Sequence, residues 1–238
     1  MKKILYILGA GFSAPMGLPV MSNFISKSKD IFASDSKKYS HFEEIYKHIN
    51  RLSRSKLYLR TDLHNIEEIL SNLEMESFIS GKPLADHFHK YIADVIKFYT
   101  PSIAPGRIDS GLWPNEIFGQ NPLFLKYGRF VSGVANWEFI TNGSPSAPQP
   151  MTEPLYVGIK GANQECYAVI SLNYDLIIES FFDCVKTHYY VDGKICISTK
   201  LGKNNECYAN NGTLYLAKIH GSIEPLNIIP PTWNKTNA

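Results

Sequence analysis

Apolar runs along the chain predict a few strands separated by long segments of other character. The short run Ile4–Leu8 is followed at once by glycine and other small residues, which predicts a buried strand that feeds a tight turn. The β-branched run Tyr167–Leu172 predicts a central strand, and Leu214–Ile219 predicts a further one. Leu176–Val185 has the pattern of a helix, and an Asp-Gly dipeptide between β-rich flanks predicts a hairpin over His188–Ile197.

Helical periodicity dominates the segment after the first strand. Apolar residues recur at helical spacing over His41–Leu52, Asn65–Ile79 and Leu84–Tyr99, so each range is predicted to form an amphipathic helix. Asp62 is the expected cap of the second of these helices. The polar, lysine-rich range Asn23–Lys38 is expected to form a helix plus an exposed connection. The absence of a predicted strand here disfavours a standard hydride-transfer dehydrogenase, because a dinucleotide-binding half needs strand, helix and strand within about thirty residues.

The range Thr100–Pro154 is rich in proline, glycine, asparagine and serine, but aromatic residues are scattered through it. This composition predicts an ordered loop region, which either packs irregularly or drapes over a site as a lid. The whole pattern predicts an α/β fold with a Rossmann-like parallel sheet and a helical, loop-rich insertion after the first strand, at about residues 24–165. We expect a single domain that spans residues 1–238.

Composition and charge narrow the classes of protein. A chain of 238 residues with 44% hydrophobic and 19% charged residues is globular in character and can bury a sizeable core. A formal net charge of +2 gives no electrostatic footprint for nucleic acid or for an acidic membrane surface. No stretch approaches the roughly 18 apolar residues of a membrane span, and Ile4–Leu8 is too short for the apolar core of a secretory signal. We therefore expect a cytoplasmic protein that binds neither nucleic acid nor membrane.

The four cysteines form no metal-binding or redox motif. Cys166, Cys184, Cys196 and Cys207 are widely spaced, and the sequence holds no C-x-x-C pair. Neither a zinc ribbon nor a dithiol redox motif can be drawn from them. We therefore expect no metal, zinc included, and four reduced thiols of which several lie in the core.

Three of the predicted strands end in clusters of small or polar residues. The first cluster has the G-x-G-x-x-G/A spacing through Gly9, Gly11 and Ala14, in which glycines let the backbone approach a phosphate. Because ligands bind beyond the carboxyl ends of parallel strands, we expect the clusters to converge there. Each also has a purely structural explanation: a tight turn, caps of the following helix, or a loop histidine. The clusters are Gly9, Ala10, Gly11, Phe12 and Ser13; Asn173 and Asp175; and His220, Gly221 and Ser222.

In this order the clusters GAGFS, NYD and HGS resemble the motifs of the sirtuin-like NAD-consuming domains, especially those of bacterial antiphage defence proteins. The phrases GLP at Gly17–Pro19, NIEEIL at Asn65–Leu70 and IIPPTWNK ending at Lys235 are similar to that defence branch too. The resemblance spans nearly the whole chain. Members of the family usually continue past the PPTW segment into further strands, so the resemblance implies that the C-terminal part of the sheet is missing or is supplied by a separate region.

The resemblance implies a role for each cluster. It implies that Asn173 and His220 are catalytic, with Asn173 orienting an attacking water and His220 accepting a proton as general base. Asp175 would lie at the nicotinamide end of NAD. The remaining residues implied to contact NAD are Gly9, Ala10, Gly11, Phe12, Ser13, Gly221 and Ser222.

The implied substrate is NAD, and three functions are consistent with that. Deacetylating sirtuins carry a four-cysteine zinc module that this sequence cannot build, so hydrolysis of NAD to nicotinamide and ADP-ribose is preferred over protein deacylation. Such an NAD glycohydrolase would act in antiphage defence by depleting NAD, as a homo-oligomer or with a partner defence protein. The alternative, from a different class, is a catalytically inert NAD- or nucleotide-binding module of a defence complex.

Overall fold

The computed structural model describes residues 2–59, 65–81, 84–103, 121–140, 156–159, 165–189, 193–198, 212–224 and 226–228. The chain forms two compact units. The first, which we call the sheet unit, comprises Met1–Leu8, Pro101–Ser171 and Leu176–Ile219. The second, the helical unit, comprises Gly9–Thr100, Leu172–Asp175 and His220–Ala238.

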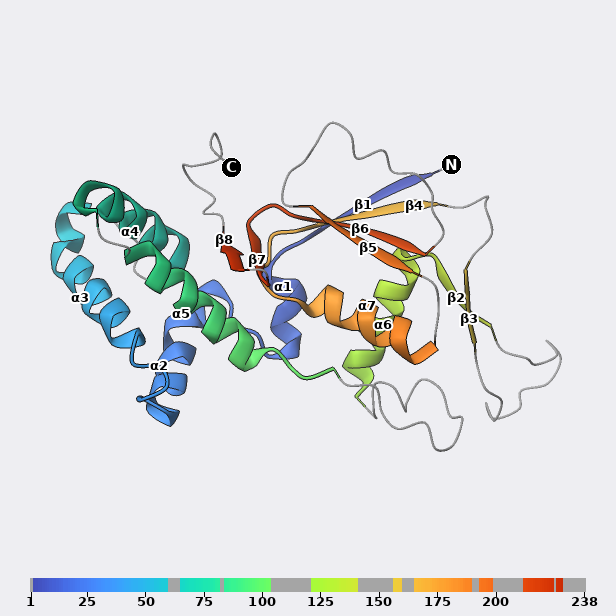
Figure 1. Ribbon diagram of the computed structural model, residues 1–238, viewed down its shortest axis with the longest axis horizontal. Helices are drawn as coiled ribbons and strands as arrows, with labels where there is room; N and C mark the ends of the chain where they lie inside the picture. The colour runs from blue at the N-terminus through green and yellow to red at the C-terminus, as the bar shows by residue number, and fades with distance from the viewer. Residues whose placement is uncertain are drawn as a thin grey trace. The chain divides into compact units, whose positions relative to one another are not determined.

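The sheet unit contains a four-stranded parallel sheet with the strand order β1-β4-β6-β5 (Figure 1). The register pairs Leu8 with Ser171 and Ser171 with Lys218, so three of the strands end side by side. The mixed α/β, Rossmann-like class predicted from the sequence is therefore confirmed. The strands are β1 (Lys3–Leu8), β4 (Cys166–Ser171), β5 (Lys194–Ser198) and β6 (Thr213–Lys218).

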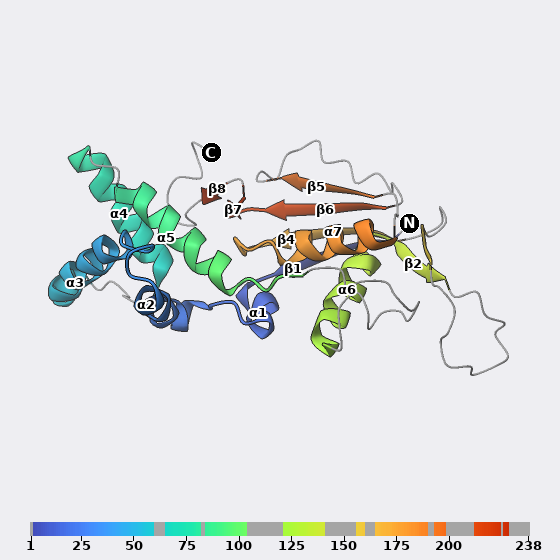
Figure 2. The same ribbon diagram turned by 60° about the horizontal axis from the view of Figure 1, so that its bottom comes forward.

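Helices α6 (Pro122–Val134) and α7 (Ile177–Tyr189) cover one face of this sheet (Figures 1 and 2). The ring of Tyr6 in β1 lies edge-on to that of Phe130 in α6, with ring centroids 5.3 Å apart. On the other face Leu5 and Ile7 are 56% and 65% exposed, as period-two alternation of a strand requires when one face is covered. The core of the unit therefore lies between the sheet and the two helices.

Two predictions for the sheet unit are wrong. There is no hairpin over 188–197 in the described residues, because α7 continues to Tyr189 and β5 pairs in parallel with β6. The range 100–154 is not only loop, since it contains α6 and β2 (Trp137–Ile140), which pairs with β3 (Tyr156–Ile159). Asn121 caps α6 by accepting a hydrogen bond from the Leu123 amide at 3.0 Å. The surrounding proline and glycine content obscured this helix start.

Gly193 explains why the Asp-Gly signal misled. This glycine directly precedes β5, and a Cβ placed on it would lie 2.5 Å from Cζ2 of Trp137 and 3.1 Å from the Gly212 carbonyl oxygen. Trp137 is buried and packs on Phe182 with ring centroids 4.6 Å apart. The glycine is therefore needed for close packing rather than for a turn.

Replacement of Gly193 by alanine is expected to lower the free energy of unfolding by about 1–3 kcal/mol, because the added methyl group overlaps a packed ring and a backbone carbonyl. Urea denaturation measures the change. Gly133→Ala in α6 is the matched control, since a Cβ there meets no atom within 4 Å, and alanine gains up to about 1 kcal/mol in a helix. Equal destabilisation by both variants would contradict this account of Gly193.

The cysteines differ in state. Cys166, at the start of β4, is disulfide-bonded, whereas Cys184 and Cys196 are free, so the prediction of four reduced thiols is wrong at Cys166. Cys184 is buried in α7, and burial raises the pKa of its thiol to about 11.

Among the described residues, no helix is long and apolar enough to cross a membrane.

The helical unit is built on four longer helices that follow the glycine turn. All the helices predicted over residues 23–99 are confirmed, and α5 has the predicted bounds. The cap of α4 is Asn65, whose side-chain oxygen accepts hydrogen bonds from the Glu67 and Glu68 amides, and not Asp62, which lies outside the described residues. The elements are α1 (Ala10–Ser13), 3-10 turns at Ala14–Met16 and Met21–Asn23, α2 (Phe24–Ser34), α3 (Phe42–Leu59), α4 (Ile66–Ser80), α5 (Leu84–Tyr99), β7 (Gly221–Ile223) and β8 (Leu226–Ile228).

Helix α5 lies beside α3 and α4 and contributes the centre of the unit's core (Figures 1 and 2). Tyr91 is fully buried, packs against Phe42 of α3 with ring centroids 4.7 Å apart, and donates its hydroxyl hydrogen to Ser28 of α2. Burial raises the pKa of Tyr91, so the phenol stays protonated and can donate. One aromatic residue thus joins three helices.

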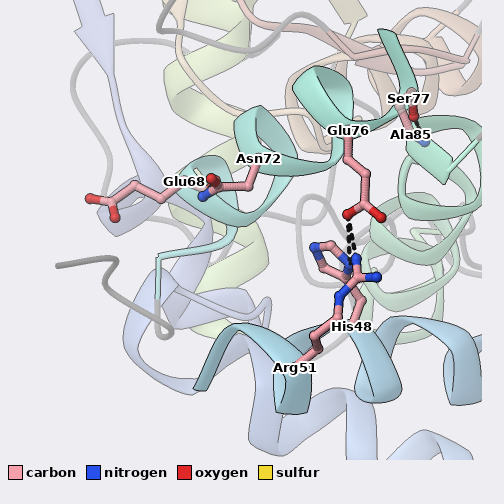
Figure 3. Close-up of polar contacts among 7 residues, drawn as sticks. All are labelled: His48, Arg51, Glu68, Asn72, Glu76, Ser77 and Ala85. Atoms are coloured by element: carbon pink, nitrogen blue, oxygen red, sulfur yellow. Dashed lines mark hydrogen bonds and ion pairs between the residues drawn. The ribbon is translucent and has the colours of Figure 1, made fainter. Parts of the chain in front are cut away.

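A polar cluster joins α3 to α4 (Figure 3). The Arg51 guanidinium donates to the Glu76 carboxylate and to Nδ1 of His48, which lies 2.8 Å away. An Nδ1 that accepts a hydrogen bond belongs to a neutral ring, and burial of His48 lowers the pKa of its imidazole. Burial likewise lowers the pKa of His41, which contacts Asp94, and of His89, which lies near Glu74.

The free energy of unfolding is expected to fall as the pH falls from 6.5, the ordinary histidine pKa, towards the lowered pKa values of His41, His48 and His89. The free energy of unfolding falls because the three histidines bind protons in this pH range in the unfolded chain but not in the folded chain. Denaturation at a series of pH values measures the slope. In His48→Gln, which keeps an acceptor for Arg51, the slope should be smaller. An unchanged slope in this variant would contradict the assignment of His48.

Candidate functional site

The chain leaves β1 at Leu8 and enters the glycine turn, Gly9–Ser13. Gly9 is extended, and its carbonyl oxygen accepts a hydrogen bond from the Phe12 amide at 2.8 Å. A Cβ placed on Gly9 or Gly11 would meet no atom within 4 Å, so open space lies beside both. The turn therefore leaves its backbone accessible to a ligand, as the sequence pattern predicts. Helix α1 has only four residues, so its dipole contributes little to the binding of an anion.

Asn173 ties the NYD cluster to the glycine turn. Its side-chain amide donates to the Gly9 carbonyl oxygen at 3.0 Å and to Oγ of Ser13 at 3.1 Å. Because a carbonyl can only accept, the nitrogen of the amide, and not its oxygen, faces Gly9. Asn173 and Ser13 are both buried, so the hydrogen bond between them lies away from solvent. Gly9 and Asn173, which are 164 positions apart in the sequence, are thus in contact, as we expect if the strand ends converge.

A cavity of about 100 Å³ lies at this junction. Its apolar lining consists of Ala10, Leu18, Pro19, Met21, Phe24, Ile66, Ile96 and Leu172. Ligand pockets for whole small molecules usually measure about 300–1,000 Å³, so this cavity suits one ring-sized part of a larger ligand. Its polar lining consists of Ser13, Glu67, Asn173, Tyr174 and Asp175.

The HGS cluster adjoins the NYD cluster through Tyr174. The rings of Tyr174 and His220 have centroids 6.4 Å apart, and the Tyr174 carbonyl oxygen accepts a hydrogen bond from the Ile223 amide at 3.1 Å. His220 is half-buried and does not line the cavity. Gly221 has a φ of 86°, a left-handed conformation in which a side chain would be strained. Ser222 is buried in β7.

Sequence reasoning missed Tyr174 and Glu67 as lining residues. The Tyr174 hydroxyl is buried and has no hydrogen-bond partner among the described residues. Burial, together with the nearby carboxylates of Glu67 and Glu74, raises the pKa of Tyr174, so the phenol is neutral. Tyr174 lies in the NYD motif and Glu67 lies in the NIEEIL motif. Only the fold shows that the two residues line the same cavity.

The structure thus brings Ala10, Ser13, Asn173 and Asp175 to one cavity, with Gly9 held by Asn173 and with His220 against Tyr174. The other residues predicted for the site, Gly11, Phe12, Gly221 and Ser222, belong to the same clusters but do not line the cavity.

Comparisons with protein-family models and with curated proteins give no match to this chain. Function is therefore inferred from the geometry of the site and from its motifs.

Replacement of Asn173 by alanine is expected to release the glycine turn and to lower the free energy of unfolding by about 1–3 kcal/mol, since the buried Ser13 hydroxyl loses this partner and the Gly9 carbonyl keeps only the Phe12 amide. Hydrogen exchange should accelerate at the Phe12 amide. Asn173→Asp is the matched control: it keeps the shape but cannot donate, so it should cost at least as much. A near-neutral Asp variant would contradict the assigned hydrogen bonds.

Proposed function

We propose that this chain is an NAD glycohydrolase, which cleaves NAD with water to give nicotinamide and ADP-ribose. The observation that carries the proposal is the hydrogen bonding of Asn173 to Gly9 and Ser13, which joins an amide and a neighbouring carboxylate, Asp175, to an open glycine turn. The resemblance of GAGFS, NYD and HGS to sirtuin-like NAD-consuming domains supplies NAD as the substrate.

The proposed reaction is a hydrolysis in which three side chains take part. Water forms a bond to C1′ of the nicotinamide ribose while the bond to the pyridinium nitrogen breaks, and the bonding electrons neutralise that nitrogen. Both amide hydrogens of Asn173 are engaged, so Asn173 orients the water through Oδ1 as an acceptor. His220 takes the proton that the water loses. Asp175 favours the positive charge that develops on the ribose.

The binding roles proposed for the other residues come from the resemblance, and the open backbone of the glycine turn supports them. Gly9, Ala10, Gly11, Phe12 and Ser13 are proposed to lie along the phosphates and ribose, where the open backbone allows close approach. Gly221 and Ser222 would complete the contacts beside His220. The cavity of about 100 Å³ suits a single ring such as nicotinamide. We further propose that the enzyme is cytoplasmic and acts in antiphage defence by depleting NAD, in a homo-oligomer or with a partner defence protein.

The purified chain is expected to release nicotinamide from NAD. Chromatography measures the nicotinamide that is released. His220→Ala should lower kcat by about a hundredfold or more, since a positioned acid–base group contributes about 10²–10⁴ in rate. His87→Ala is the control, because His87 is an exposed residue of α5 that pairs with Glu44 outside the site. Full activity in His220→Ala would overturn the catalytic assignment.

A second candidate, an inert NAD- or nucleotide-binding module, is favoured by the size of the cavity, which is too small for a whole dinucleotide. Hydrogen exchange separates the two functions. Slower exchange at residues 10–13 on addition of NAD, with no nicotinamide released, would establish binding without hydrolysis.

A further inference from the structure

A second cavity in the helical unit has no place in the proposed reaction. Its volume is about 460 Å³, within the range of small-molecule pockets, and it shares no lining residue with the cavity at Asn173. We call it the lysine groove. It is lined by Lys38, Tyr39, Lys90, Asp94, Lys97 and Phe98.

The lysine groove carries an excess of positive charge. Three ammonium groups and one carboxylate line it, although the chain as a whole is nearly neutral at +2. The carboxylate of Asp94 is engaged by Nε2 of His41, 2.9 Å away. Lys90 has no ion pair with any of the residues that the structure describes. The groove therefore favours an anion.

One helix face organises these charges. Lys90, Asp94 and Lys97 recur along α5 at the spacing that places side chains above one another on a helix, and Phe98 follows them. Phe98 is 51% exposed, so an apolar ring on the groove is left open to a ligand. Lys38 is supplied by the connection between α2 and α3, with its ammonium 5.1 Å from the ring of Tyr39.

We propose that the lysine groove binds a small phosphorylated organic molecule, whose phosphate groups pair with Lys38, Lys90 and Lys97 and whose ring lies on Phe98. Phosphate fits this chemistry because lysine binds it as a point charge from several directions. The cavity limits the ligand to a small molecule.

Lys97 also connects the groove to the segment that carries His220. Its ammonium lies 2.8 Å from the Glu224 carboxylate, and Glu224 directly follows β7 (Gly221–Ile223). Both side chains are about half exposed, at 47% and 60%, so this ion pair is weak and a phosphate can compete for it. Removal of the Glu224 charge should therefore strengthen binding of an anion in the groove.

Calorimetric titration of the full chain at low salt tests the proposal, with sodium pyrophosphate and adenosine 5′-monophosphate as probes. Lys38→Ala and Lys90→Ala should each weaken pyrophosphate binding by about three- to tenfold, and added salt should weaken it further. Glu224→Gln should strengthen it about two- to fivefold. Phe98→Ala should weaken only the nucleotide. Lys29→Ala, an exposed residue of α2 outside the groove, should change neither.

The proposal is overturned if pyrophosphate does not bind, or if it binds equally well to the wild-type chain and both lysine variants. It is also overturned if Asn173→Ala, and not the lysine variants, removes binding, because the anion would then lie at the glycine turn. Binding to phosphatidylglycerol vesicles without binding of free pyrophosphate would assign the lysines to a membrane surface. None of these results depends on whether NAD is hydrolysed.

Discussion

The site depends on one buried amide. Asn173 gives both of its N–H hydrogens to the glycine turn, one to the Gly9 carbonyl and one to the Ser13 hydroxyl. A buried polar group that loses its hydrogen-bond partner costs about 1–3 kcal/mol, so the buried pair of Asn173 and Ser13 holds the turn and the NYD cluster together. One side chain therefore fixes how the strand-end segments at Gly9 and Asn173 meet.

Strand register sets up this meeting. In the sheet unit Leu8 pairs with Ser171 and Ser171 with Lys218, and each of the three clusters follows one of these strand ends along the chain. Parallel pairing is what lets segments from the beginning, the middle and the end of the chain finish in adjacent positions. Small residues follow the first strand and polar residues follow β4, so the cavity where these two clusters meet has a mixed lining, and the HGS cluster adjoins it through Tyr174.

Much of this fold follows from local patterns. Helical periodicity located α3, α4 and α5, and the β-branched run located β4, because one apolar face per element is visible in the sequence. Helix α6 and the pairing of β5 were missed, since the first lies in proline-rich surroundings and the second depends on a distant partner, β6. For the site, sequence reasoning named Asn173, which lines the cavity, and His220, which lies against Tyr174, but it did not name Tyr174 or Glu67 as lining residues. Their place in a shared cavity is visible only in the fold. The disulfide at Cys166 had no signature in cysteine spacing.

The position of β1 in the sheet has a consequence for self-association. Strand β1 is at one end of the strand order, so in the described chain no strand pairs with its outer edge, and Leu5 and Ile7 are exposed beside it. Such an edge is a template for adding a strand from another chain, which leads to aggregation. Lys2 and Lys3 stand at its beginning, both exposed, and burying their charges between two chains would be costly. Exposed lysines at the start of an edge strand disfavour the addition of a second chain there.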